Sequence, residues 1–424
     1  MKQYNEYKDS GVKWIGKIPS HWEVNKIRSL FKLSNQKTND PNCTLLSLSQ
    51  YTGVRLKSEC ANVGMFEAET TIGYNIVQKG QFVMNIMLAW NGSYSVSNYN
   101  GVISPAYCVF DFIRNCDKKY FDYLLRLKAY SGAFKTLSKG LIDSRLRLYP
   151  EYFRTFPIVF PPVEEQNKIV AYLDNKVSKI DKYISTAEKK IAALDELKQV
   201  TIADAVTHGI NPNAPMKDSE IPWIGMVPEH WEVKTLRAYI RIYSEKYHAE
   251  KQLLSVTREQ GVILRDVDSK EENHNFIPDD LSGYKLVRRG DFAINKMKSW
   301  QGSYGVSNYE GIVSPAYYVC KLEFENKDFF SKSIRCKAYV PFFNQYSKGI
   351  RVDQWDLSPI ALKNIPFFEP PISEQNEIVT YIDRKVAQID KMKAAELAQI
   401  DKLKEYKQRL ISDVVTGKVK VTNE

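Results

Sequence analysis

The sequence predicts an α+β chain in which two copies of a mixed α/β domain are separated by two long helices. The helices are expected to form an antiparallel coiled coil, which gives the chain internal pseudo-two-fold symmetry. Three observations support this architecture. The sequence contains an internal repeat, each copy of the repeat ends in a double proline followed by a helical pattern, and the first of these helical patterns has heptad spacing. We expect domains over residues 1–160 and 210–369, a helix over 161–209, and a second helix with a tail over 370–424.

The internal repeat has an offset of about 209 residues and shows in two blocks. The first block, Trp14–Val24, recurs as Trp223–Val233 with eight of eleven positions identical. The second block, Gly80–Tyr107, recurs as Gly290–Tyr317 with 17 of 28 positions identical. Chance does not produce such agreement, so the two copies share one fold.

Each globular copy is expected to stop at its double proline, because proline neither donates to a strand ladder nor fits inside a helix. In the helix that follows the first copy, apolar residues alternate spacings of four and three, as in a coiled-coil seam. These residues are Leu173, Val177, Ile180, Ile184, Ala187, Ile191 and Leu194. In the second helix, Lys393 and Glu396 interrupt the seam. Antiparallel pairing of the two helices is the simplest arrangement, and the alternative is that each helix packs only on its own domain.

Inside the first copy, residues 81–87 and 107–110 read as strands and residues 118–130 as one helix. The tryptophans of the opening block are expected to fill the base of each domain. They are Trp14, Trp22, Trp223 and Trp231.

Charge and cysteine usage limit the class of protein. The net charge is +10, of which +9 falls in residues 1–163, so a polyanionic partner is plausible. No stretch approaches the roughly 20 apolar residues that span a bilayer, and we expect a cytoplasmic protein with no membrane contact. Six scattered cysteines without a CxxC pair suggest reduced thiols and no zinc site.

Catalytic motifs are missing. There is no Gly-rich loop for a methyl donor, no Asp/Asn-Pro-Pro-aromatic tetrapeptide and no phosphate-binding loop. His21 and His230 recur between proline and tryptophan, but neither has a local nucleophile or carboxylate arrangement that repeats, so a structural role is favoured over general-base chemistry. We therefore expect no catalytic site and no cofactor or metal bound by this chain.

Three features together resemble the specificity subunit of a type I restriction-modification system. They are the Trp-Ile-Gly-x-x-Pro-x-His-Trp-Glu-Val openings, the Pro-Pro-x-x-Glu-Gln-x-x-Ile-Val helix starts at Pro161 and Pro370, and the tail Leu403–Lys418. The resemblance covers essentially the whole chain. The stretch of the first helix that is equivalent to this tail, Gln199–Thr207, has diverged. The divergence leaves open whether the two methyltransferase docking sites that the resemblance implies are equivalent.

This resemblance implies two target-recognition domains, each reading half of a bipartite site in double-stranded DNA, and helices that dock two methyltransferase (modification) subunits. The partners would supply N6-adenine methylation and, with a restriction/translocase subunit, ATP-dependent cleavage. S-adenosylmethionine, ATP and Mg are accordingly expected on partner subunits. The competing functions are a non-catalytic DNA-binding regulator that acts without these partners and a duplicated DNA-processing enzyme.

Two domains that share one fold but bind different DNA half-sites should agree in the residues that form the scaffold and differ in the residues that contact bases. Within the second repeat block, Asn91 is replaced by Gln301, and the neighbouring Leu88 by Lys298. Asn and Gln can pair with the edge of adenine, and Lys can address guanine or phosphate. A second shared segment is Ser-Lys-Gly at 138–140 and 347–349, where a glycine beside a cation allows close approach to phosphate.

The candidate DNA-contacting residues are Asn91, Ser93, Tyr94, Lys139, Arg145, Lys296, Lys298, Gln301, Ser303, Tyr304, Lys348 and Arg351. Arg147 lies beside the second segment. The alternatives are sequence drift on an exposed loop for the first segment and an ordinary solvated turn for the second.

Overall fold

The computed structural model describes residues 3–60, 70–140, 146–266, 277–278, 280–349 and 355–421. The chain divides into two compact units, one made of Met1–Ala187 with Ala398–Glu424 and the other of Glu188–Leu397. Each unit therefore contains one globular copy and a part of each long helix.

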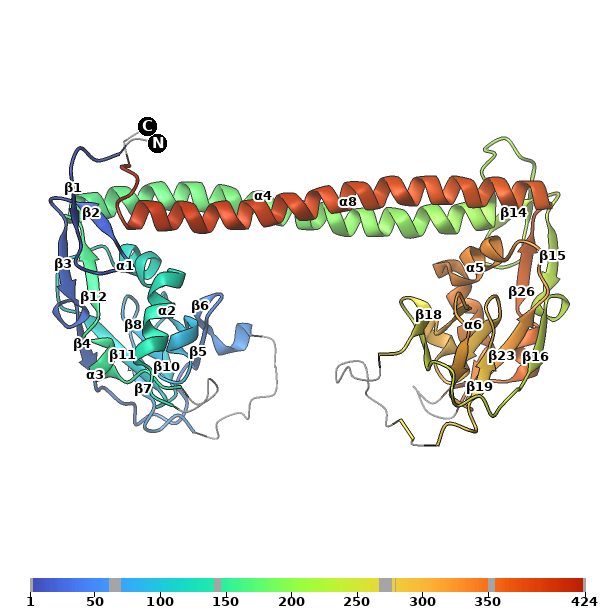
Figure 1. The fold of residues 1–424 in the computed structure, drawn as a ribbon, viewed down its shortest axis with the longest axis horizontal. Coiled ribbons are helices and arrows are strands. Elements are labelled where there is room, and N and C mark those ends of the chain that lie inside the picture. The colour runs from blue at the N-terminus through green and yellow to red at the C-terminus, as the bar shows by residue number, and fades with distance from the viewer. Residues whose placement is uncertain are drawn as a thin grey trace. The chain divides into compact units, whose positions relative to one another are not determined.

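The elements of the first globular copy follow the chain in Figure 1 from β1 to β12. Its strands are β1 (Tyr7–Asp9), β2 (Lys17–Pro19), β3 (Glu23–Lys26), β4 (Phe31–Ser34), β5 (Leu46–Ser49), β6 (Gly53–Leu56), β7 (Asn75–Val77), β8 (Phe82–Asn85), β9 (Tyr94–Val96), β10 (Gly101–Ile103), β11 (Tyr107–Phe112) and β12 (Pro157–Phe160). Its helices are η1 (Ile27–Ser29), η2 (Lys57–Glu59), η3 (Ala89–Asn91), α1 (Lys118–Leu125), α2 (Lys128–Leu137) and α3 (Pro150–Phe153).

The second copy repeats this order. Its strands are β13 (Met216–Asp218), β14 (Met226–Pro228), β15 (Glu232–Thr235), β16 (Ile240–Tyr243), β17 (Leu254–Thr257), β18 (Gly261–Leu264), β19 (Lys285–Val287), β20 (Phe292–Asn295), β21 (Tyr304–Val306), β22 (Gly311–Val313), β23 (Tyr317–Leu322), β24 (Ser347–Lys348), β25 (Asp356–Leu357) and β26 (Pro366–Glu369). Its helices are η5 (Leu236–Ala238), η6 (Ser299–Gln301), α5 (Lys327–Arg335), η7 (Lys337–Tyr339), α6 (Val340–Tyr346) and α7 (Pro359–Lys363).

Each copy is built on a four-stranded antiparallel sheet. The strand order is β4-β11-β8-β9 in the first copy and β16-β23-β20-β21 in the second. The strands predicted over residues 81–87 and 107–110 are β8 and β11, which pair at the centre of the first sheet with Val83 opposite Val109. All four residues of β8 and of β20 are buried, which explains why the first three residues of each strand are apolar without alternation.

The single helix predicted over residues 118–130 is wrong. α1 begins with Asp117 as its N-cap and ends at Leu125, and α2 begins at Lys128. Leu127 between them has extended backbone angles, and the guanidinium of Arg126 donates hydrogen bonds to the carbonyl oxygens of Gln50 and Tyr51. The sequence contains no helix breaker at this point. The hydrogen bonds of Arg126 to distant residues therefore stabilise the break between α1 and α2.

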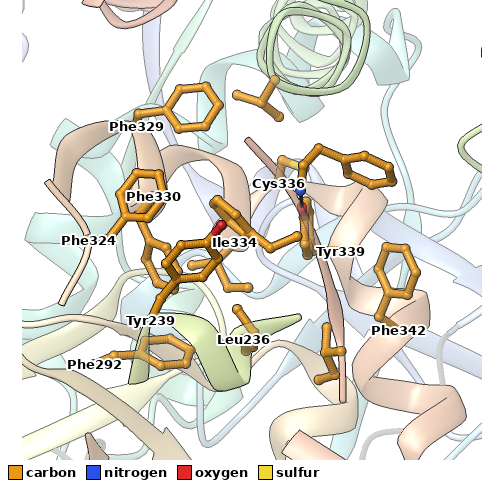
Figure 2. Close-up of a cluster of buried hydrophobic side chains, with 14 of the residues drawn as sticks. Leu236, Tyr239, Phe292, Phe324, Phe329, Phe330, Ile334, Cys336, Tyr339 and Phe342 are labelled. Atoms are coloured by element: carbon orange, nitrogen blue, oxygen red, sulfur yellow. Dashed lines mark hydrogen bonds between the residues drawn. The ribbon is translucent and has the colours of Figure 1, made fainter. Parts of the chain in front are cut away.

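Aromatic side chains fill the core on the helix side of each sheet. Figure 2 shows this cluster in the second copy, where Phe292 of β20 faces Phe330 of α5 with ring centroids 5.6 Å apart. Trp22 and Trp231 are fully buried, as expected, but Trp223 is 40% exposed and packs its edge on Phe342. The prediction that all four tryptophans fill the base is therefore wrong for Trp223. All six cysteines are free thiols, in agreement with the sequence.

The two long helices begin directly after the double prolines. α4 spans Val163–His208 and α8 spans Ile372–Val415. Within each unit, the parts of the two helices that belong to it run side by side (Figure 1). In the first unit the seam residues Leu173, Ile180 and Ile184 are buried. Among the described residues, no helix is long and apolar enough to cross a bilayer.

Interhelical ion pairs give the direction of the helices. In the second unit, Lys198 binds Asp390 at 2.9 Å and Asp195 binds Lys393 at 2.7 Å, so the numbering falls along one helix as it rises along the other. The antiparallel prediction is confirmed within this unit. Lys393, which interrupts the apolar seam, is paired and not left without a partner.

The ends of the long helices close the base of the globular copies. Val414 and Val415 of α8 are buried in the first unit, and the hydroxyl of Tyr120 donates a 2.8 Å hydrogen bond to the carbonyl oxygen of Val415. In the second unit, Ala205 and Val206 of α4 are buried in the core of the second copy. The divergent helix end that we singled out from the sequence therefore plays the same packing role as the tail.

Candidate nucleic-acid interface

One loop follows β8 and an equivalent loop follows β20, and the two loops have the same backbone hydrogen bonds. We call residues 86–91 and 296–301 the reader loops. In the first copy the side-chain oxygen of Asn85 accepts a 2.9 Å hydrogen bond from the backbone N–H of Met87. In the second copy Asn295 accepts the corresponding bond from Met297 at 3.2 Å. Asn85 and Asn295 are buried, so a fixed side chain shapes the start of each loop.

The far end of each reader loop is also bonded alike. The backbone N–H of Ser93 donates to the carbonyl oxygen of Leu88 at 3.2 Å, and that of Ser303 donates to Lys298 at 3.2 Å. One backbone frame thus presents different side chains in the two copies, as the repeat predicted.

The structure brings the Ser-Lys-Gly segment beside the reader loop in each copy. The backbone of Lys139 pairs with that of Arg147, and the next residue, Leu148, donates to the carbonyl oxygen of Ile86 at 2.9 Å. In the second copy β24 pairs with β25, and Leu357 donates to the carbonyl oxygen of Lys296 at 3.2 Å. Two segments that lie about 50 residues apart in sequence therefore form one surface.

Basic side chains gather around the reader loop of the first copy. The ammonium of Lys135 lies 5.3 Å from the ring of Trp90, and that of Lys139 lies 5.3 Å from the ring of Tyr152. Arg147 is exposed beside them. Cations that rest on aromatic rings are held in place and still reach solvent, which suits contact with phosphate.

The second copy carries its cations on the loop itself. Lys298 and Lys348 are exposed, and Lys296 forms a 3.0 Å ion pair with Asp356 of the adjacent strand. The hydrogen bond with Asp356 raises the pKa of Lys296, so this side chain stays charged. The two interfaces therefore share a basic character but differ in the position of their charges.

Other predicted contacts are accessible or lie outside the described residues. Asn91 is exposed and Gln301 partly exposed, each at the last position of its 3-10 helix. Arg145 and Arg351 lie outside the residues that the structure describes.

Four predicted contacts are buried and are withdrawn from the candidate set. Ser93 is 3% exposed and Ser303 is 4% exposed, and each directly precedes the strand that leaves the loop, β9 or β21. Tyr94 has no exposed surface, and its hydroxyl donates a 2.7 Å hydrogen bond to the carbonyl oxygen of Leu125. Tyr304 stacks on an aromatic ring of α6 and is 1% exposed. Their identity in both copies reflects the shared core and not DNA contact.

The sequence comparison missed an exposed methionine in each loop. Met87 is 43% exposed and Met297 is 54% exposed. The candidates were polar, aromatic or charged residues with hydrogen-bonding or phosphate-binding chemistry, so an apolar side chain was not selected. The available signal was an apolar residue kept in both copies within a segment that otherwise varies.

Each of the repeated histidines contacts a glutamate at the start of a long helix. His21 forms a 2.5 Å contact with Glu165, and the indole N–H of Trp22 donates to the same carboxylate at 3.0 Å. His230 contacts Glu374 at 2.7 Å in the second copy. The opening motif is thereby tied to the glutamate of the Pro-Pro-x-x-Glu helix start. In the part of the chain that the structure describes, no three His, Cys, Asp or Glu residues are grouped to hold a metal ion.

The chain is similar in sequence and fold to several known proteins. Residues 19–194 match the family described as the type I restriction modification DNA specificity domain. The specificity subunit of the type I restriction enzyme MjaVIII from Methanocaldococcus jannaschii is 25% identical over 363 residues, which is 80% of each chain.

Two solved structures share the fold. A chain from a study of complex assembly in the type I R-M system gives a TM-score of 0.64 at 13% identity, with 94% of this chain and 98% of that chain covered. The HsdS subunit from Thermoanaerobacter tengcongensis gives a TM-score of 0.53 at 14% identity, with 97% and 100% covered.

Proposed function

The chain belongs to the family of type I restriction-modification specificity subunits, and from this premise we propose that it selects the DNA sequence on which partner subunits act. Each globular copy binds one half of a bipartite site in double-stranded DNA. One observation carries the proposal: the reader loops have the same backbone hydrogen bonds and expose different polar side chains.

The exposed side chains have the chemistry of base readout. Asn91 and Gln301 each carry an amide that can donate to and accept from the major-groove edge of adenine. Lys298 can address guanine or a phosphate, and Lys139 and Lys348, on the segments beside the loops, can contact phosphates. The two half-sites therefore differ in sequence, and phosphate contacts set the register of each domain.

We assign the chemistry to partner subunits. Two methyltransferase subunits, with S-adenosylmethionine, bind this chain along its helices, and a restriction/translocase subunit that uses ATP and Mg completes the cleaving complex. Two observations support this assignment: the sequence lacks the catalytic motifs named above, and both repeated histidines are paired with glutamates at the helix starts. Accordingly, the purified chain should transfer no methyl group to DNA, and activity that follows this chain through rigorous removal of other subunits would contradict the assignment.

The test uses reciprocal double variants in complex with the methyltransferase subunits. Lys298→Ala with Gln301→Ala should relax the half-site of the second domain, and Asn91→Ala with Lys139→Ala should relax the other. Removing a bidentate pair of hydrogen bonds to a base should cost about 1–3 kcal/mol, or roughly 5- to 150-fold in discrimination. Methylated adenines would be mapped across a genome. If both variants methylate the wild-type site with undiminished specificity, the reader loops are not the readers.

A further inference from the structure

An exposed methionine stands at the same point of both reader loops. Met87 and Met297 each have about half of their surface in solvent, although the residues on either side differ between the copies. Ile86 and Leu88 flank the first methionine, and Lys296 and Lys298 flank the second. Burial in the domain does not explain why this apolar residue is the same in both copies while its neighbours differ. Its identity therefore indicates contact with a binding partner.

The backbone of this methionine is held on both sides in the first copy. Its N–H donates to the buried side chain of Asn85, and its carbonyl oxygen accepts a 2.9 Å hydrogen bond from the indole N–H of Trp90. In the second copy the N–H of Met297 is bonded to Asn295 in the same way. The indole N–H of Trp300 has no hydrogen-bond partner there among the residues that the structure describes, and its ring packs on Trp355 with ring centroids 5.2 Å apart. The loop therefore presents the methionine from a prearranged backbone, which reduces the entropy lost on binding.

The surroundings of the methionines identify the binding surface. Lys139 and Arg147 form an isolated β-bridge beside the first loop. In the second copy Lys298 lies on the loop itself, and Lys348 lies on the adjacent strand β24. A polyanion is therefore the partner whose charge complements this surface. An unbranched, polarisable side chain adapts to irregular apolar surfaces, and in the major groove the apolar group of a base edge is the C5-methyl of thymine.

We propose that Met87 and Met297 are specificity-determining DNA contacts, and that each packs against the C5-methyl of a thymine in its own half-site. The inference rests on the proposed function and extends it. Because the methionine is the same in both copies, the two half-sites share this thymine, while the residues around the methionine read the positions at which the half-sites differ.

The first test measures binding of the complex with its methyltransferase subunits to a duplex that carries the mapped bipartite site. Met87→Ala and Met297→Ala should each weaken binding about tenfold, because these variants no longer bury apolar area against the thymine methyl. Met87→Leu should restore most of the affinity. Met226→Ala is the matched control, since Met226 is 46% exposed on β14 at the base of the second copy and should have no effect.

The second test replaces each thymine of the half-sites in turn with uracil, which removes the methyl group alone. One replacement per half-site should weaken the wild-type complex about as much as the alanine variant of the facing methionine, and that variant should not distinguish thymine from uracil there. Wild-type affinity in the alanine variants, or further weakening of the variants by the same uracil, would overturn the inference. Absence of any bipartite preference in the wild type would instead overturn the proposed function.

Discussion

Replacing Gly417 with alanine should open the base of the first globular copy. This glycine follows α8 in the left-handed region, with φ of +74°. A Cβ placed on it would lie 2.4 Å from Cδ of Pro19, 2.7 Å from Cγ of the same ring and 3.0 Å from Cη2 of the buried Trp22. Neither a proline ring nor a fully buried indole can move aside at low cost, so the end of α8 must shift.

The second copy offers a matched control in Gly209, which follows α4 with φ of +76°. Its Cβ would meet Glu374 Oε1 at 3.2 Å, a tight contact that a shift of a few tenths of an ångström at the end of this side chain relieves, and Trp231 Cζ2 at 3.4 Å, an ordinary van der Waals distance. Gly209→Ala should therefore cost mainly the left-handed backbone, about 1–2 kcal/mol. Gly417→Ala should add about 1–3 kcal/mol of overpacking, for a total of about 2–5 kcal/mol in the opening free energy of this base.

Hydrogen exchange followed by mass spectrometry measures the two bases separately, which avoids a single unfolding transition for a chain with two units. Peptides that cover β2 and β3 should exchange much faster in Gly417→Ala, and those that cover β14 and β15 should change modestly in Gly209→Ala. The reasoning is refuted if the two variants accelerate exchange by the same factor, because the contacts with Pro19 and Trp22 would then add nothing.

Three further predictions concern the helices and the base of the first copy. At low salt, Asp195→Lys and Lys393→Asp should each lower the melting temperature of the helices by an amount equivalent to about 0.2–1 kcal/mol of stability, and the double variant with both charges reversed should recover it. A double variant that melts no higher than the single variants would show that this ion pair does not stabilise the helices. Burial opposes ionisation of Glu165, but hydrogen bonds from Trp22, His21 and Tyr4 outweigh this effect and lower the pKa of its carboxyl group. Protection of β2 from hydrogen exchange should therefore be lost as pH falls below the ordinary glutamate value of 4.5, and Glu165→Gln should remove this pH dependence. Deleting one heptad from both α4 and α8 shortens each by about 10 Å, roughly three base pairs and about 100° of helical turn, so methylation at the original spacer should disappear; its persistence in a variant of normal circular dichroism would show that the helices do not set the spacing.

The repeat and its prolines were sufficient to predict the fold. Pro-Pro at the end of a buried strand can only separate that strand from a helix, and the heptad positions from Leu173 to Leu194 require an apolar partner. The break between α1 and α2 was not predictable, because it depends on bonds from Arg126 to a distant hairpin and not on any local signal.

The candidate site was predicted in part. Comparison of the copies located the reader loops, and the structure then placed the Ser-Lys-Gly segment beside them through the Ile86 and Lys296 carbonyls. The same comparison could not separate a tyrosine kept for the core from one kept for DNA, so Tyr94 was misassigned. Burial is a property of the assembled sheet, and identical residues in two copies do not reveal it.

The division of the chain into units has a consequence for synthesis on the ribosome. The second unit is continuous, Glu188–Leu397, and all of its contacts exist once that stretch has been translated. The first unit needs Ala398–Glu424 as well, so its base stays open while more than 200 later residues are made. Since domains generally fold as they emerge, the order of completion is reversed here: the later domain closes first, and a ribosome that stops early would release a chain whose first domain has an uncovered core.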